Sequence, residues 1–136
     1  MTVVRYLLDT NICIYIAKRR PQEVAGRFER LSPGEVGMSM ITYGELLFGA
    51  EKSQHPQQAA ERLQRFAELV PVLALPDESP RHYARIRAEL ERSGTPIGAN
   101  DLWIASHALA SDLILVSNNL REFGRVSGLQ TENWAH

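Results

Sequence analysis

Cysteine is almost absent from this chain: Cys13 is the only one among 136 residues. A lone cysteine forms no internal disulfide, and one cysteine with four scattered histidines gives no zinc-site spacing. Long apolar runs are also missing, because a stretch such as Leu113–Val116 is far shorter than the ~20 residues that span a bilayer. The first residues carry Arg5 in their apolar run and show no cleavage site of a signal peptide. We therefore expect a cytoplasmic protein without disulfides, zinc modules or membrane helices.

The chain also lacks an excess of charge of either sign. Fifteen basic and sixteen acidic side chains give a formal net charge of −1 with histidine neutral, so any affinity for nucleic acid must come from a local patch. Apolar residues make up 44% and charged residues 23%, which is typical of a globular protein and excludes a disordered one. The length predicts a single domain over residues 1–136.

Short apolar segments that alternate with helical patterns indicate the fold class. Each segment is apolar on both faces, as in a parallel sheet that helices cover on both sides. The sequence therefore predicts an α/β domain with a short, mostly parallel central sheet. We expect its strands at Val3–Leu8, Val36–Ser39, Val72–Leu75 and Leu113–Val116. Residues 117–121 are expected to form a loop, and the tail after them is weakly patterned.

Three carboxylates stand in apolar surroundings near the expected ends of strands or starts of helices. Asp9 directly follows the first strand, so its side chain either caps the next helix or faces a cleft. Glu45 lies on an apolar helix stripe, although Thr42 and Glu45 also match the Thr-x-x-Glu capping box. Asp101 lies in the first turn of a helix that Asn100 is expected to cap, where an acid favours the helix dipole without any function. Each acid therefore has a purely structural alternative.

Taken together, the three acids predict a metal site. Hard cations such as Mg²⁺ and Mn²⁺ take oxygen ligands, and like charges in one cleft repel one another unless a cation lies between them. Such cations catalyse phosphodiester hydrolysis without a histidine or cysteine nucleophile.

Four motifs in order resemble those of the PIN-domain ribonucleases, over nearly the whole chain. They are Leu8-Asp9-Thr10-Asn11, the segment from Ser39 to Leu46, Gly98-Ala99-Asn100-Asp101, and the segment from Leu115 to Phe123. The length and residues 95–101 and 119–123 are similar to VapC toxins of bacterial toxin–antitoxin systems. The resemblance implies that Asp9, Glu45 and Asp101 are catalytic and bind Mg²⁺ or Mn²⁺. It also implies an endoribonuclease that cuts RNA such as tRNA or ribosomal RNA loops, a VapB-like antitoxin partner and a homodimer.

The chain departs from the family pattern after its last expected strand. Ser117, Asn118 and Asn119 stand where many relatives carry an aspartate, so the number of metal ions is left open. We expect Asn119 to assist catalysis. We expect Asn118, Ser117 and Asn11 to orient the metal ligands without binding the metal themselves. Glu122 is the nearest acid that could compensate, and its structural alternative is a surface residue at a helix start.

Arginines are the candidates for gripping RNA. The chain has 13 arginines and only two lysines, and guanidinium groups suit bidentate contacts to phosphate. Arg81, Arg85 and Arg87 cluster on one expected helix. The alternative is a solvated helix face on which they pair with Glu89 and Glu91.

Two other functions compete with a nuclease. A phosphoaspartyl phosphatase or receiver-like domain also places an aspartate after its first strand. It would need a second aspartate where Asn11 stands and a lysine late in the chain, whereas Lys52 is the last one. A non-catalytic relative that only binds RNA or protein is the other alternative.

Overall fold

The computed structural model describes residues 3–135, which contain five strands and seven helices. The strands are β1 (Tyr6–Leu8), β2 (Val36–Ser39), β3 (Val72–Leu73), β4 (Ile114–Val116) and β5 (Thr131–Glu132). The helices are α1 (Thr10–Lys18), α2 (Gln22–Glu29), α3 (Met40–Glu51), α4 (Pro56–Leu69), α5 (Ser79–Arg92), α6 (Ala99–Ser111) and α7 (Leu120–Phe123).

The strands form one parallel sheet in the order β3-β2-β1-β4-β5. β1 is central, and its Tyr6 is in register with Val36 of β2 and Ile114 of β4. The chain builds outward from β1 to β2 and β3 on one side, and later to β4 and β5 on the other. This reversal makes the edge where β1 and β4 end a topological switch point. Open α/β sheets bind their ligands at such points.

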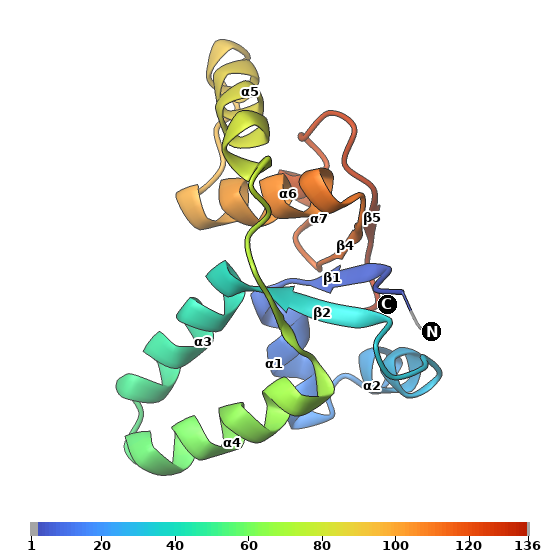
Figure 1. The fold of residues 1–136 in the computed structure, drawn as a ribbon, viewed down its shortest axis with the longest axis vertical. Coiled ribbons are helices and arrows are strands. Elements are labelled where there is room, and N and C mark those ends of the chain that lie inside the picture. The colour runs from blue at the N-terminus through green and yellow to red at the C-terminus, as the bar shows by residue number, and fades with distance from the viewer. Residues whose placement is uncertain (1–2, 136) are drawn as a thin grey trace.

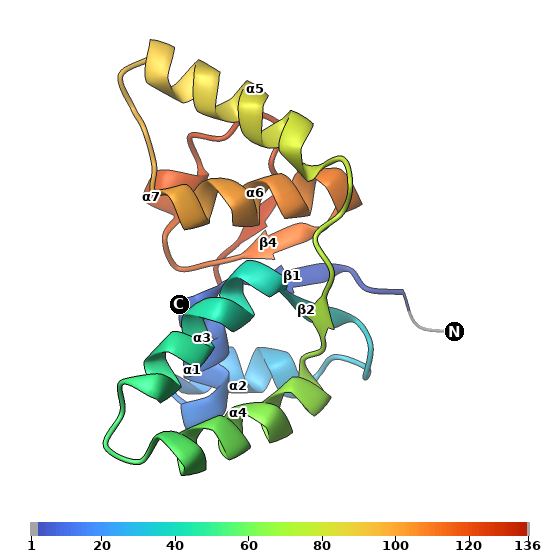
Figure 2. The same cartoon turned by 60° about the vertical axis from the view of Figure 1, so that its left-hand side comes forward.

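Helices cover both faces of the sheet, with α1 to α4 on one side and α5 to α7 on the other (Figure 1; Figure 2). Side chains on a strand alternate between the two faces, and both faces are buried here. Tyr6 and Leu8 belong to the core beneath α1, α2 and α4, whereas Leu7 belongs to the second core beneath α5 and α6. The sheet is therefore a thin apolar layer between two helical layers.

This architecture confirms the predicted α/β class with helices on both faces. The observed strands are shorter than expected at three of the four positions, and Val3 is exposed rather than part of β1. Two elements were missed: β5 is a two-residue edge strand, and α7 is a single turn in what was expected to be a loop and an unpatterned tail. Elements this short carry no periodic signal. No helix within residues 3–135 is both long and apolar enough to cross a membrane.

A buried histidine links the two halves of the molecule. His107 of α6 is 1% exposed, and its Nδ1 lies 3.1 Å from Oγ of Ser39 at the end of β2. Burial lowers the pKa of His107 from 6.5 to about 4. The unfolded chain therefore binds more protons than the folded one between these pH values, so stability falls as the pH drops through this window.

We predict that His107→Gln reduces this loss of stability in acid. Between pH 7 and pH 4.5 the free energy of unfolding of the wild type should fall by up to ~2 kcal/mol more than that of the variant. The slope is ~1.4 kcal/mol per pH unit where the unfolded chain holds one proton more than the folded one. Urea unfolding of both proteins in chelator measures the difference, and the carboxylates common to both cancel. An equal stability difference between the two proteins at both pH values would show that His107 does not titrate in this way.

Candidate metal centre

The candidate site lies at the switch point, where β1 and β4 end side by side. The amide of Asp9 donates to the carbonyl of Val116 at 3.0 Å, which continues the pairing of β1 with β4 by one residue. Ser117 follows β4 directly and is fully buried. The parallel sheet therefore brings two residues that are 108 positions apart in sequence into contact.

Asp9 caps α1 and also contacts the end of β4. Its Oδ1 accepts a hydrogen bond from the amide of Ile12 at 3.0 Å and so caps α1. Its Oδ2 accepts from the hydroxyl of Ser117 at 2.5 Å. Burial raises the pKa of Asp9 above its usual 3.8, the two hydrogen bonds oppose this shift, and the charge of Glu45 adds to it. The side chain is 5% exposed, so it lies in a nearly enclosed position.

Glu45 is held by a residue of another helix. The predicted capping box is wrong, because α3 begins at Met40 and its cap is Ser39, whose Oγ accepts from the amide of Ile41 at 3.2 Å. The carboxylate Oε1 of Glu45 accepts instead from the hydroxyl of Thr10 at 2.6 Å. Glu45 therefore faces the start of α1, next to Asp9.

Asp101 stands in the first turn of α6, and the structure places a fourth acid beside it. The helix begins at Ala99 after Gly98, so the expected cap at Asn100 is wrong. Burial, then a hydrogen bond with Glu122, then the charges of Glu122, Glu45 and Asp9 raise the pKa of Asp101 from 3.8 to about 7. All three predicted acids therefore influence one another and form one electrostatic neighbourhood.

The sequence left two roles open for Glu122: a surface residue at a helix start, or an acid that compensates for the missing aspartate. It lies in α7, and its Oε2 accepts from Nδ2 of Asn119 at 3.0 Å. The one sequence feature that points to Glu122 is its position three residues after Asn119, a polar residue directly before a short helix. That spacing predicts a helix start but does not reveal that α7 turns Glu122 toward α6.

The polar residues after β4 hold the acids and the first helix in place. The hydroxyl of Ser117 accepts from the amide of Asn119 at 2.9 Å while it donates to Asp9. Asn118 donates to the hydroxyl of Tyr15 at 2.7 Å and accepts from Asn11 at 3.4 Å. Ser117 and Asn119 therefore contact acids directly, whereas Asn118 and Asn11 contact each other and Tyr15. The roles expected for these four residues stay predictions.

The chemistry of this donor set fits a hard divalent cation. No ion pair among residues 3–135 includes Asp9, Glu45, Asp101 or Glu122. As they stand, no three acidic, histidine or cysteine side chains in this described part of the chain are arranged to hold one ion. Among the described residues the four carboxylates thus have no cationic partner, and neutral donors hold three of them, Asp9, Glu45 and Glu122.

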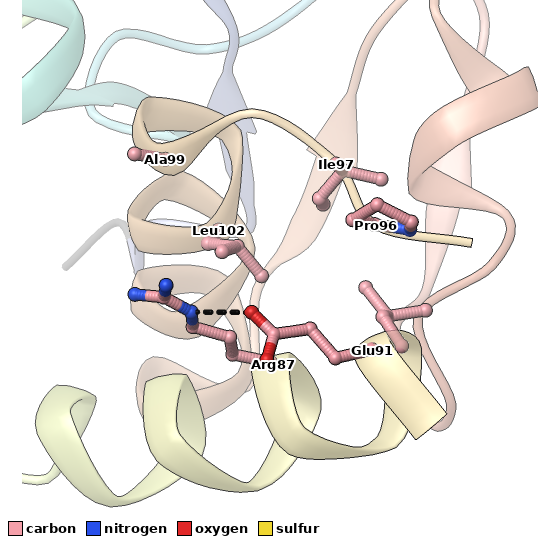
Figure 3. Close-up of a pocket in the computed structure, with 7 residues that line it drawn as sticks. Arg87, Glu91, Pro96, Ile97, Ala99 and Leu102 are labelled. Carbon is pink, nitrogen blue, oxygen red and sulfur yellow. Dashed lines mark hydrogen bonds and ion pairs between the residues drawn. The ribbon is translucent and has the colours of Figure 1, made fainter. Parts of the chain in front are cut away.

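The three predicted RNA-binding arginines are engaged along their own helix. Arg81, Arg85 and Arg87 each pair with a glutamate of the same segment, at 3.5, 3.5 and 2.9 Å. Figure 3 shows Arg87 and Glu91 pointing toward one another at a pocket of about 250 Å³ between α5 and the start of α6. This geometry is the one that the solvated-face alternative anticipates, and the RNA contacts stay a prediction.

A larger groove of about 870 Å³ opens between α1, α2, α3 and α4. Thr10 and Glu45 line it at the start of α1, and Lys18 and Arg19 line it at the other end, ~12 Å further along that helix. Its apolar lining includes Ile14, Ile16, Phe28, Leu46, Leu63 and Phe66. The groove thus has an apolar floor and a charged lining that includes two acids, Glu45 and Glu29, and four bases, Lys18, Arg19, Arg62 and Arg65.

Comparison with known proteins identifies the family. The model of the PIN domain matches residues 6–129. Ribonuclease VapC2 of Haemophilus influenzae is 46% identical over 132 residues, which cover 97% of this chain and 99% of that protein. The tRNA(fMet)-specific endonuclease VapC of Shigella flexneri is 44% identical over 133 residues, covering 98% and 100%.

Solved structures agree with the sequence comparison. VapBC-1 from nontypeable Haemophilus influenzae matches with a TM-score of 0.90 and 40% identity, covering 99% of this chain and 100% of that one. DNA-bound VapBC from Salmonella typhimurium matches with a TM-score of 0.89 and 40% identity, covering 96% and 98%. The chain therefore belongs to the PIN-domain family and, within it, to the VapC ribonucleases.

Proposed function

We propose that this chain is a metal-dependent endoribonuclease toxin that hydrolyses RNA phosphodiester bonds. The observation that carries the proposal is the meeting of four carboxylates at the switch point, with no cationic side chain paired to any of them among residues 3–135. Membership of the VapC ribonucleases supports it. The receiver-like alternative has no such support, because neither its second aspartate nor its late lysine is present.

Asp9, Glu45 and Asp101 would hold the cation, and Glu122 joins them as the acid that compensates for the missing aspartate after β4. PIN-domain nucleases of the VapC type generally depend on a divalent metal, and we propose Mg²⁺ or Mn²⁺ here. When bound, such a cation supplies the positive charge that the acids lack and polarises the phosphodiester group and the attacking water.

The remaining polar residues act by positioning. Asn119 holds the carboxylate of Glu122, and Ser117 holds that of Asp9. Both are neutral donors, so they orient the acids and leave their negative charge available to a cation. We therefore assign Asn119 a positioning role within the catalytic set, with Asn118 and Asn11 fixing the loop after β4 against α1.

The proposed substrate is a structured RNA, with initiator tRNA as the first candidate. Two similar proteins, from Shigella flexneri and Salmonella typhimurium, are named tRNA(fMet)-specific endonucleases. Loops of such RNAs expose unstacked nucleotides that a protein can reach. We expect the protein to act in the cytoplasm, where this RNA is found.

We propose that a VapB-like antitoxin inhibits the chain and occupies the groove between α1 and α4. Several similar structures are VapBC complexes. The apolar floor of the groove, with Glu45 at the end next to the candidate metal centre, favours an apolar segment that carries a basic side chain near Glu45. Such a segment would place a cation among the acids and thereby compete with the metal.

We also propose that the chain forms a homodimer in which the two copies pack against each other through α3. Met40 and Phe48 are 51% and 64% exposed, and Leu47 beside them is exposed as well. They lie on one side of the helix together with Gly44, above which a side chain would meet open space. An exposed apolar stripe with a small residue at its centre suits close packing against a second copy of the same helix.

The sharpest test of the nuclease proposal is Asp101→Asn. We expect the purified wild type to cleave initiator tRNA with Mg²⁺ or Mn²⁺, and the variant to lose at least ~100-fold in rate while its fold persists. Asp112→Asn is the matched control, because it makes the same change at the exposed far end of α6, where asparagine tolerates the left-handed backbone. Mapping of RNA ends and circular dichroism give the two readouts.

Two outcomes contradict the nuclease proposal. Intact RNA with the wild type and added metal, in the proven absence of antitoxin, would favour a binding module. Equal activity of wild type and Asp101→Asn would remove Asp101 from the catalytic set.

Burial of Asp101 among other acids also predicts a trade-off between metal binding and stability. Because the folded pKa of Asp101 is about 7 against 3.8, the ionised side chain lowers stability increasingly as the pH rises between these values. In chelator we expect Asp101→Asn to be about as stable as the wild type near pH 4 and ~1–2 kcal/mol more stable at pH 8, a figure reduced for partial exposure.

With Mn²⁺ added at pH 8, the wild type should unfold at a higher temperature than Asp101→Asn, because only the wild type is stabilised by binding the ion. A stability difference that changes with neither pH nor Mn²⁺ would show that the pKa of Asp101 is not raised and that Asp101 does not bind the ion.

The groove assignment predicts that Ala17→Glu weakens the complex with the cognate antitoxin. Ala17 is exposed and lines the groove, so the longer charged side chain fills it without disturbing the core. We expect at least ~10-fold loss of affinity in a direct binding titration. Ala84→Glu, on exposed α5, is the control. Equal affinity of the two variants would place the antitoxin elsewhere.

A further inference from the structure

Thr10 forms a hydrogen bond with Glu45 that the sequence does not predict. It is the first residue of α1, directly after Asp9, and its hydroxyl donates to Oε1 of Glu45 at 2.6 Å. The bond joins α1 to α3 across 35 residues of sequence. Its two partners also line the end of the large groove, so the bond lies beside the candidate metal centre and not deep in the core.

Glu45 needs such a hold because the surrounding charges repel it. Its negative charge raises the pKa of both Asp9 and Asp101, and the repulsion is mutual. A partly exposed glutamate on a flexible side chain would reduce this repulsion by turning toward solvent. Within residues 3–135, Glu45 forms no ion pair, and the bond from Thr10 is its one side-chain hydrogen bond.

A hydroxyl suits this task better than a basic side chain. Lysine or arginine at the position of Thr10 would neutralise Glu45 and occupy the place of a metal ion. A hydroxyl donates one hydrogen bond to one carboxylate oxygen, keeps the full negative charge, and leaves Oε2 free. The hydroxyl is itself well placed, because Asp9 caps α1 and pairs with Val116 of the sheet edge.

We propose that Thr10 is a positioning residue that keeps Glu45 at the metal centre and so sets the affinity for the divalent cation. The inference rests on the proposed function, in which Glu45 is a ligand. Thr10 does not need to touch RNA in this role. Its loss should therefore change the metal requirement of the reaction and leave the binding of RNA unchanged.

The test compares two threonine-to-valine changes that remove a hydroxyl and keep the shape. Thr10→Val removes the donor to Glu45, whereas Thr42→Val removes a buried hydroxyl of α3 that has no hydrogen-bond partner. Thr10→Ser restores the hydroxyl. Calorimetric titration of the chelator-treated proteins with Mn²⁺ gives the affinity without any reaction.

We expect Thr10→Val to bind Mn²⁺ ~10- to 100-fold more weakly, the range found for outer partners of metal ligands. Its cleavage rate should recover as Mn²⁺ is raised, with an unchanged KM for RNA. Thr10→Ser and Thr42→Val should stay within ~3-fold of the wild type. If Thr10→Val does not fold, as circular dichroism would show, Thr10→Ala takes its place with the same expectation.

Two results would overturn the proposal: wild-type Mn²⁺ affinity in Thr10→Val, or an equal loss in Thr42→Val. Glu45→Gln separates this failure from failure of the proposed function. If Glu45→Gln loses Mn²⁺ binding and cleavage while Thr10→Val keeps both, only the positioning role is wrong. If Glu45→Gln keeps both, Glu45 is not a ligand and the metal centre itself is misassigned.

Discussion

Repulsion among four carboxylates at one edge of the sheet is the constraint on which the rest of the site depends. Folding brings Asp9, Glu45, Asp101 and Glu122 into one neighbourhood, and burial first, with the neighbouring acids adding to it, raises the pKa of Asp9 and Asp101. Neutral donors hold the acids there: hydroxyls for Asp9 and Glu45, and an amide for Glu122. The charge is kept rather than cancelled, which prepares the site for a cation.

The fold delivers these side chains because it is a switch-point sheet with helices on both faces. β1 and β4 end together, so Asp9 and Ser117 meet regardless of their distance in sequence. α3 brings Glu45 from one helical layer, and α6 and α7 bring Asp101 and Glu122 from the other (Figure 2). The acids thus sit where the two layers meet, and an antitoxin in the groove of the first layer can reach them.

Features that depend on neighbouring residues in the sequence could be predicted, whereas features that depend on contacts between distant segments could not. Asp9, Glu45 and Asp101 were identifiable because each lies in a local motif, and the alternation of apolar segments gave the class and four of the strands. Glu122 and the bond from Thr10 depend on tertiary placement, with one partner on a single-turn helix and the other 35 residues away. The capping box at Thr42 failed because α3 already begins at Met40, with Ser39 as its cap, so Thr42 lies inside the helix.

The most direct test of the metal centre is a crystal structure of the chain grown with Mn²⁺, with anomalous scattering measured to locate the ion. We expect a peak bounded by carboxylate oxygens of Asp9, Glu45 and Asp101, with Glu122 turned toward it, at ligand distances of ~2.2 Å. An active protein whose Mn²⁺ lies away from these acids, or whose acids stay unoccupied at saturating Mn²⁺, would contradict the convergence of the four carboxylates on a cation.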